Sequence, residues 1–358
     1  MSLSCIDSMA ISFHLRAQRY IFEDAKKIVS LIFATFTKYE AIASSDIKIN
    51  GKTIALGDSV RVKANIAKLP SGTLIDLPVY VFRSKKKGPT VLLSGGLHGD
   101  EINGIEIIRR MLDESKFDLL NRGSVVAIPV MNIYGFLNFS REVPDGKDIN
   151  RSFPGHSGGS LAARVAHFLN KNILSQIDYG IDFHTGGSSR FNFPQVRYAA
   201  ADKKAAELAK AFAPPVILKS GLIEKSLRKQ AHKMGKPMLV FEGGESLRLD
   251  EEVVQEGVNG ALRVLQHLKM IDDAPERNVE AVVLEQSTWI RAKRSGIYTG
   301  TMKSGMSISK NDTIGMITDP FGEFKIKIKA NRPGFIIGHN NMPVVNQGDA
   351  LIHLGLLK

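Results

Sequence analysis

The chain of 358 residues contains a single cysteine, Cys5. One cysteine cannot form an intramolecular disulfide, and it excludes a zinc cluster built from several cysteines. No uncharged apolar run reaches the roughly 20 residues that a membrane-spanning helix requires. Because 43% of the residues are hydrophobic, the chain can instead bury a sizeable core, and we expect a globular protein with no membrane partner.

The densest basic segments of the chain contain no aromatic residues. Lys and Arg number 48 against 36 Asp and Glu, which gives a formal net charge of +12. Segments 83–87 and 225–236 are the most basic, and neither contains a Phe, Tyr or Trp that could stack on a base. We therefore expect no nucleic-acid partner. A basic surface that attracts small anionic substrates is the favoured interpretation.

Residues 1–45 are predicted to be an N-terminal extension that is largely helical. Tyr20 to Ala43 has helix-like apolar spacing. A signal peptide is an alternative, because Lys26 and Lys27 precede an apolar stretch over 28–36 and small residues over 41–43. That segment begins far from Met1 and its apolar stretch is short, so we expect a cytoplasmic protein. Export, or a translation start upstream of the true one, remains the alternative.

Residues 46–272 are predicted to form one α/β domain. Continuous apolar runs that indicate buried strands alternate with runs of helical period. The predicted strands are 89–94, 124–130 and 237–241, and the predicted helices cover 102–112, 161–169 and 254–265. Buried strands that alternate with amphipathic helices indicate a sheet covered by helices on both faces.

Residues 273–358 are predicted to form a small all-β domain. Short strands such as 287–292, 325–330 and 350–354 are separated by glycines. The segment 292–297, Ala-Lys-Arg-Ser-Gly-Ile, is similar in sequence to the segment 330–335, Ala-Asn-Arg-Pro-Gly-Phe. This weak repeat predicts a sandwich of two similar halves with quasi-twofold symmetry. The single tryptophan, Trp289, is expected to pack inside it.

A histidine and a glutamate follow the first of the predicted strands. In Gly95-Gly96-Leu97-His98-Gly99-Asp100-Glu101, the strand ends at Ser94 and a helix begins near Glu101. Both side chains would then lie at the carboxyl edge of the sheet, where open α/β sheets bind ligands. Taken alone, the pattern fits a capping glutamate beside a loop histidine equally well.

A second strand end supplies a further histidine. Asp182-Phe183-His184-Thr185-Gly186 closes another short predicted strand. Two imidazoles and one carboxylate, with one position left for water, are typical of a catalytic rather than a structural zinc site. We therefore predict one zinc ion per chain, held by His98, Glu101 and His184.

A third motif lies between these two, and it makes a resemblance specific. Residues 148–155 read Asp-Ile-Asn-Arg-Ser-Phe-Pro-Gly. Gly-x-His-x-x-Glu, Asp-x-Asn-Arg-x-Phe-Pro-Gly and Asp-x-His, in this order, resemble the zinc carboxypeptidase superfamily. Within it, the chain is most similar to the succinylglutamate desuccinylase/aspartoacylase family, from about residue 46 to 270. The resemblance implies a zinc-carboxypeptidase-like mixed sheet flanked by helices, followed by a small β domain.

The resemblance also implies roles for individual residues. Asp148 resembles the carboxylate that orients a zinc-bound histidine, most simply His98. Asn150 and Arg151 resemble the pair that grips a substrate carboxylate, which a planar guanidinium does through two hydrogen bonds. Arg141 resembles the arginine that polarises the scissile carbonyl, with a surface arginine beside a Pro-Gly loop as the alternative.

A hydrolase of this kind needs a general base. Residues 237–242 are a buried apolar strand that ends on Glu242, directly before two glycines. A glutamate in this position is out of place unless it faces a cleft, and it matches the family's catalytic glutamate. Glu245, three residues later, is the competing candidate. His156, which follows the Phe-Pro-Gly of the third motif, is a further candidate to line the site.

The C-terminal segment resembles the barrel-sandwich fold of lipoyl and biotinyl carriers. Those carriers present a modifiable lysine on a hairpin, but the corresponding stretch here, 318–323, has no lysine. We therefore expect a structural or gating role for this segment. Substrate specificity is expected to lie in loops such as residues 187–198.

The combined prediction is a zinc-dependent hydrolase that cleaves the amide, or an ester, of an N-acyl amino acid or similar small carboxylate. A metallocarboxypeptidase that acts on peptides or cell-wall fragments shares the same catalytic residues and is the alternative. A non-enzymatic binding module built around the β domain is a third candidate. A homo-oligomer is compatible with the sequence, which does not specify the oligomeric state.

Overall fold

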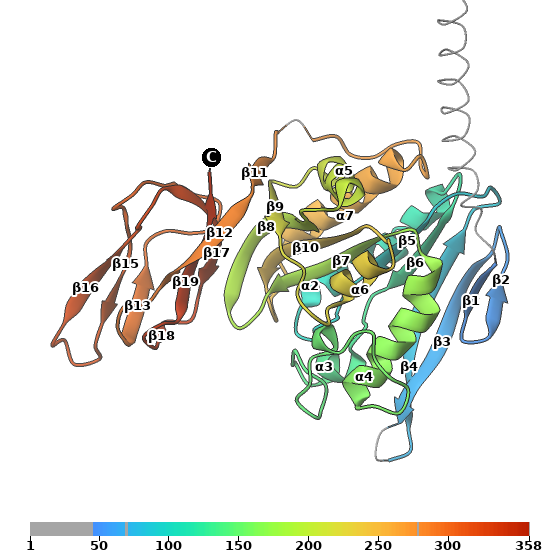
Figure 1. The fold of residues 1–358 in the computed structure, drawn as a ribbon, viewed down its shortest axis with the longest axis horizontal. Helices are drawn as coiled ribbons and strands as arrows, with labels where there is room; N and C mark the ends of the chain where they lie inside the picture. The colour runs from blue at the N-terminus through green and yellow to red at the C-terminus, as the bar shows by residue number, and fades with distance from the viewer. Residues whose placement is uncertain (1–45, 69–70, 278, 358) are drawn as a thin grey trace, which may run out of the picture. The chain divides into compact units, whose positions relative to one another are not determined.

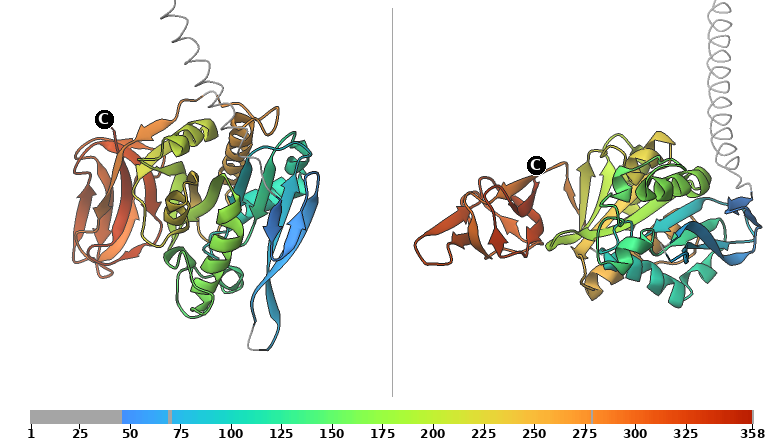
Figure 2. Two further views of the ribbon diagram at one scale, coloured as in Figure 1. Left: turned by 45° about the vertical axis from the view of Figure 1, so that its right-hand side comes forward. Right: turned by 90° about the horizontal axis from the view of Figure 1, so that it is seen from below.

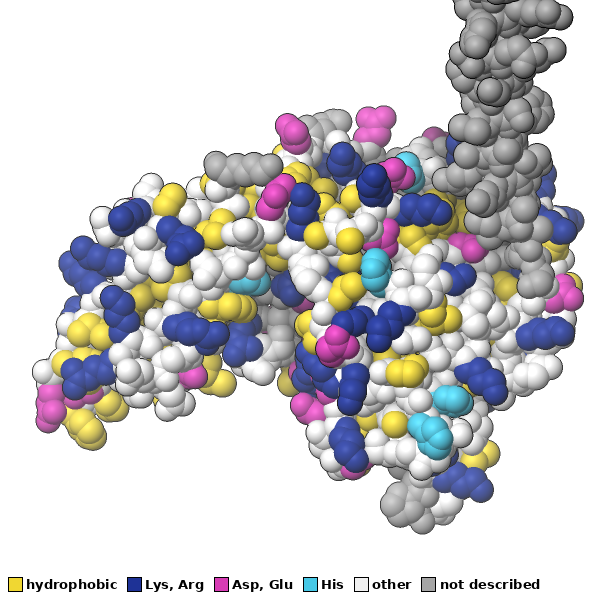
Figure 3. Space-filling model, viewed as in Figure 1, with side chains coloured by type: hydrophobic (Ala, Val, Ile, Leu, Met, Phe, Trp, Pro, Cys, Tyr) yellow, Lys and Arg dark blue, Asp and Glu magenta, His cyan; other side chains and the backbone are white. Residues whose placement is uncertain are grey.

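The structure is a computed structural model that describes residues 46–68, 71–277 and 279–357. The predicted N-terminal extension, residues 1–45, lies outside the described residues, so the prediction for it stays untested. Within the described residues, no helix is long and apolar enough to cross a membrane. Lys and Arg side chains are spread over the face shown in Figure 3 rather than gathered in one patch.

One large mixed sheet organises the described chain (Figure 1). Ten of its thirteen strands follow the order β12-β19-β17-β8-β10-β7-β5-β6-β4-β3, and β9, β11 and β14 pair beside this path. A separate hairpin precedes it, formed by β1 (Ile47–Ile49) and β2 (Lys52–Ile54). The first eight strands of this sheet along the sequence are β3 (Ser59–Lys68), β4 (Leu74–Arg83), β5 (Thr90–Ser94), β6 (Ser124–Ile128), β7 (Tyr179–Gly186), β8 (Arg190–Ala199), β9 (Val216–Ser220) and β10 (Met238–Glu245).

The strands at the centre of this sheet are parallel and largely buried. β6, β5, β7 and β10 run side by side in parallel, and every residue of β5, β6 and β7 is buried. Parallel strands with helices on both faces need apolar side chains on both faces, which explains their continuous apolar sequences. The predicted strands over 89–94, 124–130 and 237–241 are thereby confirmed.

Helices cover both faces of the sheet (Figures 1 and 2). One face packs against α4 and α6, and the other packs against α2, α5 and α7. The helices are α2 (Ile102–Asp113), α3 (Ile133–Leu137), α4 (Leu161–Phe168), α5 (Lys203–Phe212), α6 (Leu227–Lys233) and α7 (Glu251–His267), with short helical turns at Lys116–Leu119, Ile149–Arg151, Leu169–Ile173 and Leu174–Gln176. The three predicted helices are confirmed as α2, α4 and α7, and the α/β class is confirmed with them.

The C-terminal strands form a two-layered sandwich. They are β11 (Val282–Leu284), β12 (Gln286–Arg291), β13 (Gly296–Gly300), β14 (Ser307–Ile308), β15 (Thr313–Thr318), β16 (Lys325–Lys329), β17 (Gly334–Asn340), β18 (Val344–Val345) and β19 (Ala350–Leu356). A four-stranded sheet, β16-β15-β13-β18, packs against the end of the large sheet. The core between the two layers includes Ile317, Ile328, Ile336, Leu351 and Ile352.

The weak sequence repeat corresponds to a repeated hydrogen-bonding pattern. Ala292 accepts from the N–H of Gly348 and donates to the carbonyl of Asp349, at 2.9 and 2.8 Å. Ala330 accepts from the N–H of Asn311 and donates to the carbonyl of Asp312, at 2.8 and 2.9 Å. The predicted quasi-twofold sandwich therefore has a physical basis in matched backbone contacts.

The C-terminal strands continue the large sheet without a break. β17 pairs with β8, and β11 pairs in parallel with β9. A shared sheet thus joins residues 46–272 to residues 273–358. The division of the chain into two domains at this boundary stays a prediction.

One expectation about the chain is wrong. Residues 187–198 are expected from the sequence to form a specificity loop, but Arg190–Ala199 is strand β8, which pairs with β9, β10 and β17. Both faces of β8 are only partly buried, so polar and apolar residues do not alternate along it as they do in a typical strand. Pro194 also argues against a strand when only the sequence is considered.

Helix α2 lies close to β7 because Gly104 has no side chain. A Cβ at Gly104 would lie 2.5 Å from the carbonyl oxygen of Phe183. This approach brings the start of α2, which follows Glu101, toward the end of β7, which carries His184.

We expect Gly104→Ala to destabilise the fold. Alanine favours a helix over glycine by up to about 1 kcal/mol, but the overlap with backbone atoms cannot be relieved by a rotamer change. The expected net loss is about 1–3 kcal/mol in the free energy of unfolding, measured by urea denaturation. Gly221→Ala is the matched control, because no atom lies within 4 Å of a Cβ built there. Equal stability of the two variants would contradict this account.

Candidate active site

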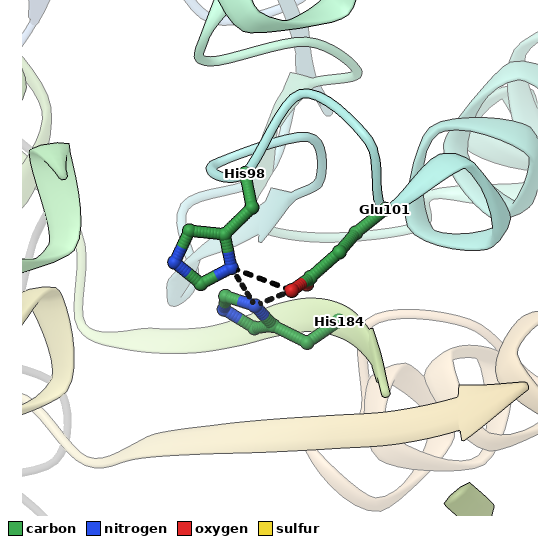
Figure 4. A group of neighbouring side chains, drawn as sticks. All are labelled: His98, Glu101 and His184. Carbon is green, nitrogen blue, oxygen red and sulfur yellow. Dashed lines mark hydrogen bonds and ion pairs between the residues drawn. The ribbon is translucent and has the colours of Figure 1, made fainter. Parts of the chain in front are cut away.

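Three side chains from two neighbouring strand ends point toward one another (Figure 4). His98 follows β5, Glu101 immediately precedes α2, and His184 lies in β7. The Nδ1 atoms of His98 and His184 lie 2.7 Å from Oε1 and Oε2 of Glu101 respectively, and 3.2 Å from each other. All three residues are buried, so the structure brings together the predicted ligand set.

Burial and mutual attraction act on these groups in opposite directions. Burial alone would lower the pKa of each histidine, but the pKa of His98 is raised by Glu101 and Asp148, and that of His184 by Asp182 and Glu101. Burial would raise the pKa of Glu101, but the two imidazoles hold it well below its usual range. The cluster therefore retains an ionised carboxylate that faces two imidazole nitrogens.

A further carboxylate lies beside each imidazole, and the one beside His184 forms a hydrogen bond with it. Asp182 Oδ2 lies 2.7 Å from His184 Nε2, and Ser94 donates to the other Asp182 oxygen at 2.7 Å. Asp148 Oδ1 lies 3.5 Å from His98 Nε2, which makes no hydrogen bond among the described residues. A hydrogen bond from the remote ring nitrogen leaves Nδ1 as the ligand atom and makes it more basic. Asp148 therefore lies close to His98, and its role as the orienting carboxylate stays a prediction.

This donor set fits a zinc ion. Zinc binds nitrogen and carboxylate oxygen at about 2.0–2.2 Å, so tetrahedral ligand atoms lie on the order of 3.3 Å apart. The donor atoms of His98, Glu101 and His184 are spaced at 2.7–3.2 Å. A cation at their centre would replace the protons that these contacts otherwise require.

Arg141 lies beside this cluster. Its guanidinium pairs with Asp148 at 2.8 Å, approaches His98 Nδ1 at 3.1 Å and lies 3.5 Å from Glu101 Oε1. The side chain is partly exposed and lines the cavity described below. It is therefore placed to donate a hydrogen bond to a group bound next to the ligand set.

The two candidate bases have different surroundings. Glu242 pairs in register with His184 on the neighbouring strand, and it lines the cavity. Its Oε2 accepts from Asn192 at 2.8 Å, and its Oε1 lies 3.1 Å from Arg197. The register of β10 shifts after Glu242, and Glu245 is buried against Asn341 at 2.6 Å. The structure thus places Glu242, but not Glu245, among the residues that line the cavity.

A cavity of about 320 Å³ joins these residues, a size suited to a small molecule. Five arginines line it: Arg141, Arg151, Arg190, Arg197 and Arg228. Arg141 and Arg197 pair with carboxylates of the chain, whereas Arg228 donates to Ser220 and to the carbonyl of Gly221. Burial and, to a smaller extent, Arg197 lower the pKa of Arg228 to about 10, so Arg228 is still charged at neutral pH.

Asn150 and Arg151 enter the cavity from the turn at Ile149–Arg151. Asn150 Oδ1 accepts from the N–H of Leu227 at 2.9 Å, which orients its amide nitrogen as the group that can donate to a ligand. Arg151 donates to the carbonyl of Asn150 at 2.7 Å and lies 4.0 Å from Asp148. Both residues line the cavity, as their predicted carboxylate-binding role requires.

Several residues of the cavity were not predicted from the sequence. Asp182 could have been found, since residues i and i+2 of a strand share a face and Asp182 precedes His184 by two. Arg190, Asn192 and Arg197 were missed because β8 was not recognised. His156, a candidate from the sequence, is not among the residues that line the cavity.

The expectation for Trp289 was incomplete. Trp289 does stack on His353 within the C-terminal strands, with ring centroids 4.2 Å apart. Both rings also line the cavity, together with the residues of the α/β segment. Because no sequence pattern predicted that β12 and β19 extend the large sheet, their contribution to the site could not be foreseen.

Residues 87–268, half of the chain, match the model of the succinylglutamate desuccinylase/aspartoacylase catalytic domain. The chain belongs to the succinylglutamate desuccinylase/aspartoacylase family. The matched residues include the ligand set, Glu242 and the arginines from Arg141 to Arg228.

Relatives of this family are similar to this chain beyond the residues that the family model matches. N-α-acetyl-L-2,4-diaminobutyric acid deacetylase of Halomonas elongata is 26% identical over 291 residues, which cover 77% of this chain and 84% of that protein. A succinylglutamate desuccinylase/aspartoacylase structure from Rhodobacter sphaeroides has a TM-score of 0.75 at 26% identity, covering 87% of this chain and 98% of that one. A succinylglutamate desuccinylase structure from Silicibacter sp. TM1040 has a TM-score of 0.76 at 21% identity, covering 85% and 97%. The shared fold therefore includes the C-terminal strands.

We expect Asp182→Asn to weaken metal binding by roughly 10- to 100-fold, because the amide holds His184 less firmly in the ligand tautomer. The dissociation constant for Zn²⁺ would be measured at pH 7 by competition with a chelator. Asp178→Asn is the matched control: Asp178 directly precedes the same strand and accepts from the N–H of Thr90 at 2.9 Å. A change of less than twofold in Asp182→Asn, or an equal loss in the control, would disprove the role of Asp182.

Proposed function

We propose that this chain is a zinc-dependent hydrolase that cleaves the amide bond of a small N-acyl amino acid or similar carboxylate. The observation that carries the proposal is the convergence of His98, Glu101 and His184 in a cavity that also holds Glu242. Family membership and the deacetylase relative support the same class of reaction.

The proposed ligands are His98, Glu101 and His184. When bound, zinc supplies Lewis-acid polarisation of a carbonyl and promotes the ionisation of water. Two imidazoles and one carboxylate leave a coordination position open, as catalytic rather than structural zinc sites do.

Glu242 is the proposed general base. It takes a proton from the attacking water and passes it to the leaving nitrogen. Asn192 and Arg197 each contact one of its carboxylate oxygens, so the side chain is held in a single orientation toward the cavity. Because the carboxylate is partly exposed to the cavity rather than enclosed, a water molecule can reach it.

Arginines provide the remaining chemistry. Arg141 donates to the oxygen on which negative charge develops as the carbonyl is attacked. Asn150 and Arg151 bind the carboxylate of the substrate, which fixes the scissile amide relative to Glu242. Arg228, which has only neutral hydrogen-bond partners among the described residues, adds a further positive charge to the same cavity.

We expect Glu242→Gln to lower kcat by roughly 10²–10⁴-fold, the usual contribution of a positioned general base. The variant should keep its fold and its metal, because glutamine occupies nearly the same volume and can still hydrogen-bond Asn192. Steady-state kinetics and metal analysis would test this. Glu245→Gln is the matched control from the same strand. If the control loses activity and Glu242→Gln does not, Glu245 is the base.

A substrate panel tests the proposed class. We expect the metal-loaded enzyme to hydrolyse N-acetyl or N-succinyl amino acids faster than peptides with free C-termini, because a cavity of about 320 Å³ suits a small molecule. Amides of the same amino acids should be poorer substrates, since they lack the carboxylate that Arg151 binds. Release of free amine would be measured before and after chelation. Faster cleavage of long peptides than of every N-acyl amino acid would favour a carboxypeptidase.

A further inference from the structure

Paired residues link the candidate metal ligands to the C-terminal strands across the large sheet, with one irregularity in β10. His184 on β7 pairs with Glu242 on β10; the register then shifts, and Gly244, two residues later on β10, pairs with Asn192 on β8. Asn192 pairs with Gly338 on β17, which pairs with His353 on β19. His353 in turn pairs with Trp289 on β12. The same sheet therefore carries the proposed base and a second group of cavity residues.

Glycine at position 338 makes room among these paired residues. A Cβ at Gly338 would lie 2.8 Å from Asn192 Oδ1 and 3.3 Å from His353 Cβ. Asn192 is the residue that donates to Glu242. The absence of a side chain at Gly338 thus lets the side chains of Asn192 and His353 pack close to its backbone.

His353 carries a buried nitrogen without a partner. The residue is 6% exposed, and its Nε2 lies 2.9 Å from the hydroxyl of Ser287. Its Nδ1 has no hydrogen-bond partner among the described residues. A buried polar atom without a partner is costly, so such atoms call for an explanation.

The ring of His353 is held in place and uncharged. It stacks on Trp289 with an angle of 8° between the rings. Burial and, to a smaller extent, the nearby Arg197 lower the pKa of His353 to about 3. A neutral imidazole bears one N–H, and the Ser287 hydroxyl can donate to Nε2, which leaves the proton on Nδ1.

The surroundings of His353 are positively charged. Arg190 lies over the Trp289 ring, with its guanidinium carbon 6.0 Å from the ring centroid, and its Nε atom is also buried without a partner among the residues that the structure describes. Arg197 lines the same cavity. A ligand group beside these residues would be a hydrogen-bond acceptor, such as a carboxylate or amide oxygen.

We infer that His353 is a specificity-determining residue, whose Nδ1 donates a hydrogen bond to an acceptor oxygen on the part of the substrate remote from the scissile amide. Trp289 holds the imidazole, and Arg190 lies on the same wall of the cavity. This inference rests on the proposed function, and it adds to that function a contribution from the last strand of the sheet.

His353→Phe tests the inference, because phenylalanine keeps a ring against Trp289 and removes both nitrogens. Substrates would be compared in pairs that differ only in the remote group: N-succinyl against N-butyryl amino acids, and N-acetylaspartate against N-acetyl-2-aminobutyrate. We expect the ratio of kcat/KM between the polar and apolar members of one pair to fall roughly tenfold to a hundredfold. His353→Asn, whose Nδ2 lies near the position of Nδ1, should restore part of this ratio.

His339→Phe is the matched control. His339 also contacts an aromatic ring, Phe191, at 5.4 Å and a serine hydroxyl, Ser304, at 2.7 Å, but it is not among the residues that line the cavity. Its substrate ratio should stay within twofold of the wild type. Metal content and thermal unfolding would be measured for each variant to show that it folds. If His353→Phe does not fold, His353→Leu would be used in its place.

Binding can be measured without turnover. Trp289 is the single tryptophan of the chain, so tryptophan fluorescence reports on this wall directly. In a Glu242→Gln background, the polar substrate should change the emission in a saturable way, and His353→Phe should raise its apparent Kd at least tenfold.

The outcomes separate this inference from the proposed function. If the wild type hydrolyses N-acyl amino acids but His353→Phe changes both members of every pair equally, or changes neither, the inference is wrong and the proposed function stands. An equal loss of discrimination in His339→Phe would also overturn it. If the wild type hydrolyses no member of the panel, the proposed function fails and the inference falls with it.

Discussion

The arrangement of this site depends on keeping one ionised carboxylate out of water. Glu101 is 2% exposed, and a buried carboxylate is strongly unfavourable unless it is paired. Two imidazoles approach its two oxygens; Asp182 accepts a hydrogen bond from His184, and Asp148 lies 3.5 Å from His98. Removing His98 or His184 would leave one oxygen of the buried Glu101 carboxylate without its imidazole partner. This cluster is held at the ends of two neighbouring strands. The close packing at Gly104 and the turn that carries Asp148 bring further parts of the chain next to it.

Much of the candidate site could be predicted from the sequence, because its residues lie where strands end. His98, Glu101 and Glu242 each follow a continuous apolar run, and His184 follows a short strand that Asp182 interrupts, so each could be placed at the carboxyl edge of the sheet from nearby residues alone. The helices that cover the sheet were predictable for a similar reason, since their apolar residues recur with helical period. Both signals are local in the sequence.

The rest of the cavity depends on pairings between distant segments, which leave no local signal. Arg197 belongs to a strand whose faces are both partly buried, so its alternation is weak. His353 reaches the cavity only because β17 pairs with β8, two segments separated by more than a hundred residues. Neither composition nor periodicity specifies such a pairing. The sequence identifies Arg197 and His353, but it does not indicate which residues lie next to them in the folded chain.

The last strands of the continuous sheet are synthesised after the strands that carry most of the candidate site. Chains emerge from the ribosome with the N-terminal segments first, so His98, Glu101, His184 and Glu242 are synthesised before Trp289 and His353. Until β17 arrives, the first residues of β8 have an unpaired edge, and exposed strand edges invite pairing with other chains. The C-terminal strands, which add Trp289 and His353 to the cavity, therefore also pair with this edge of β8.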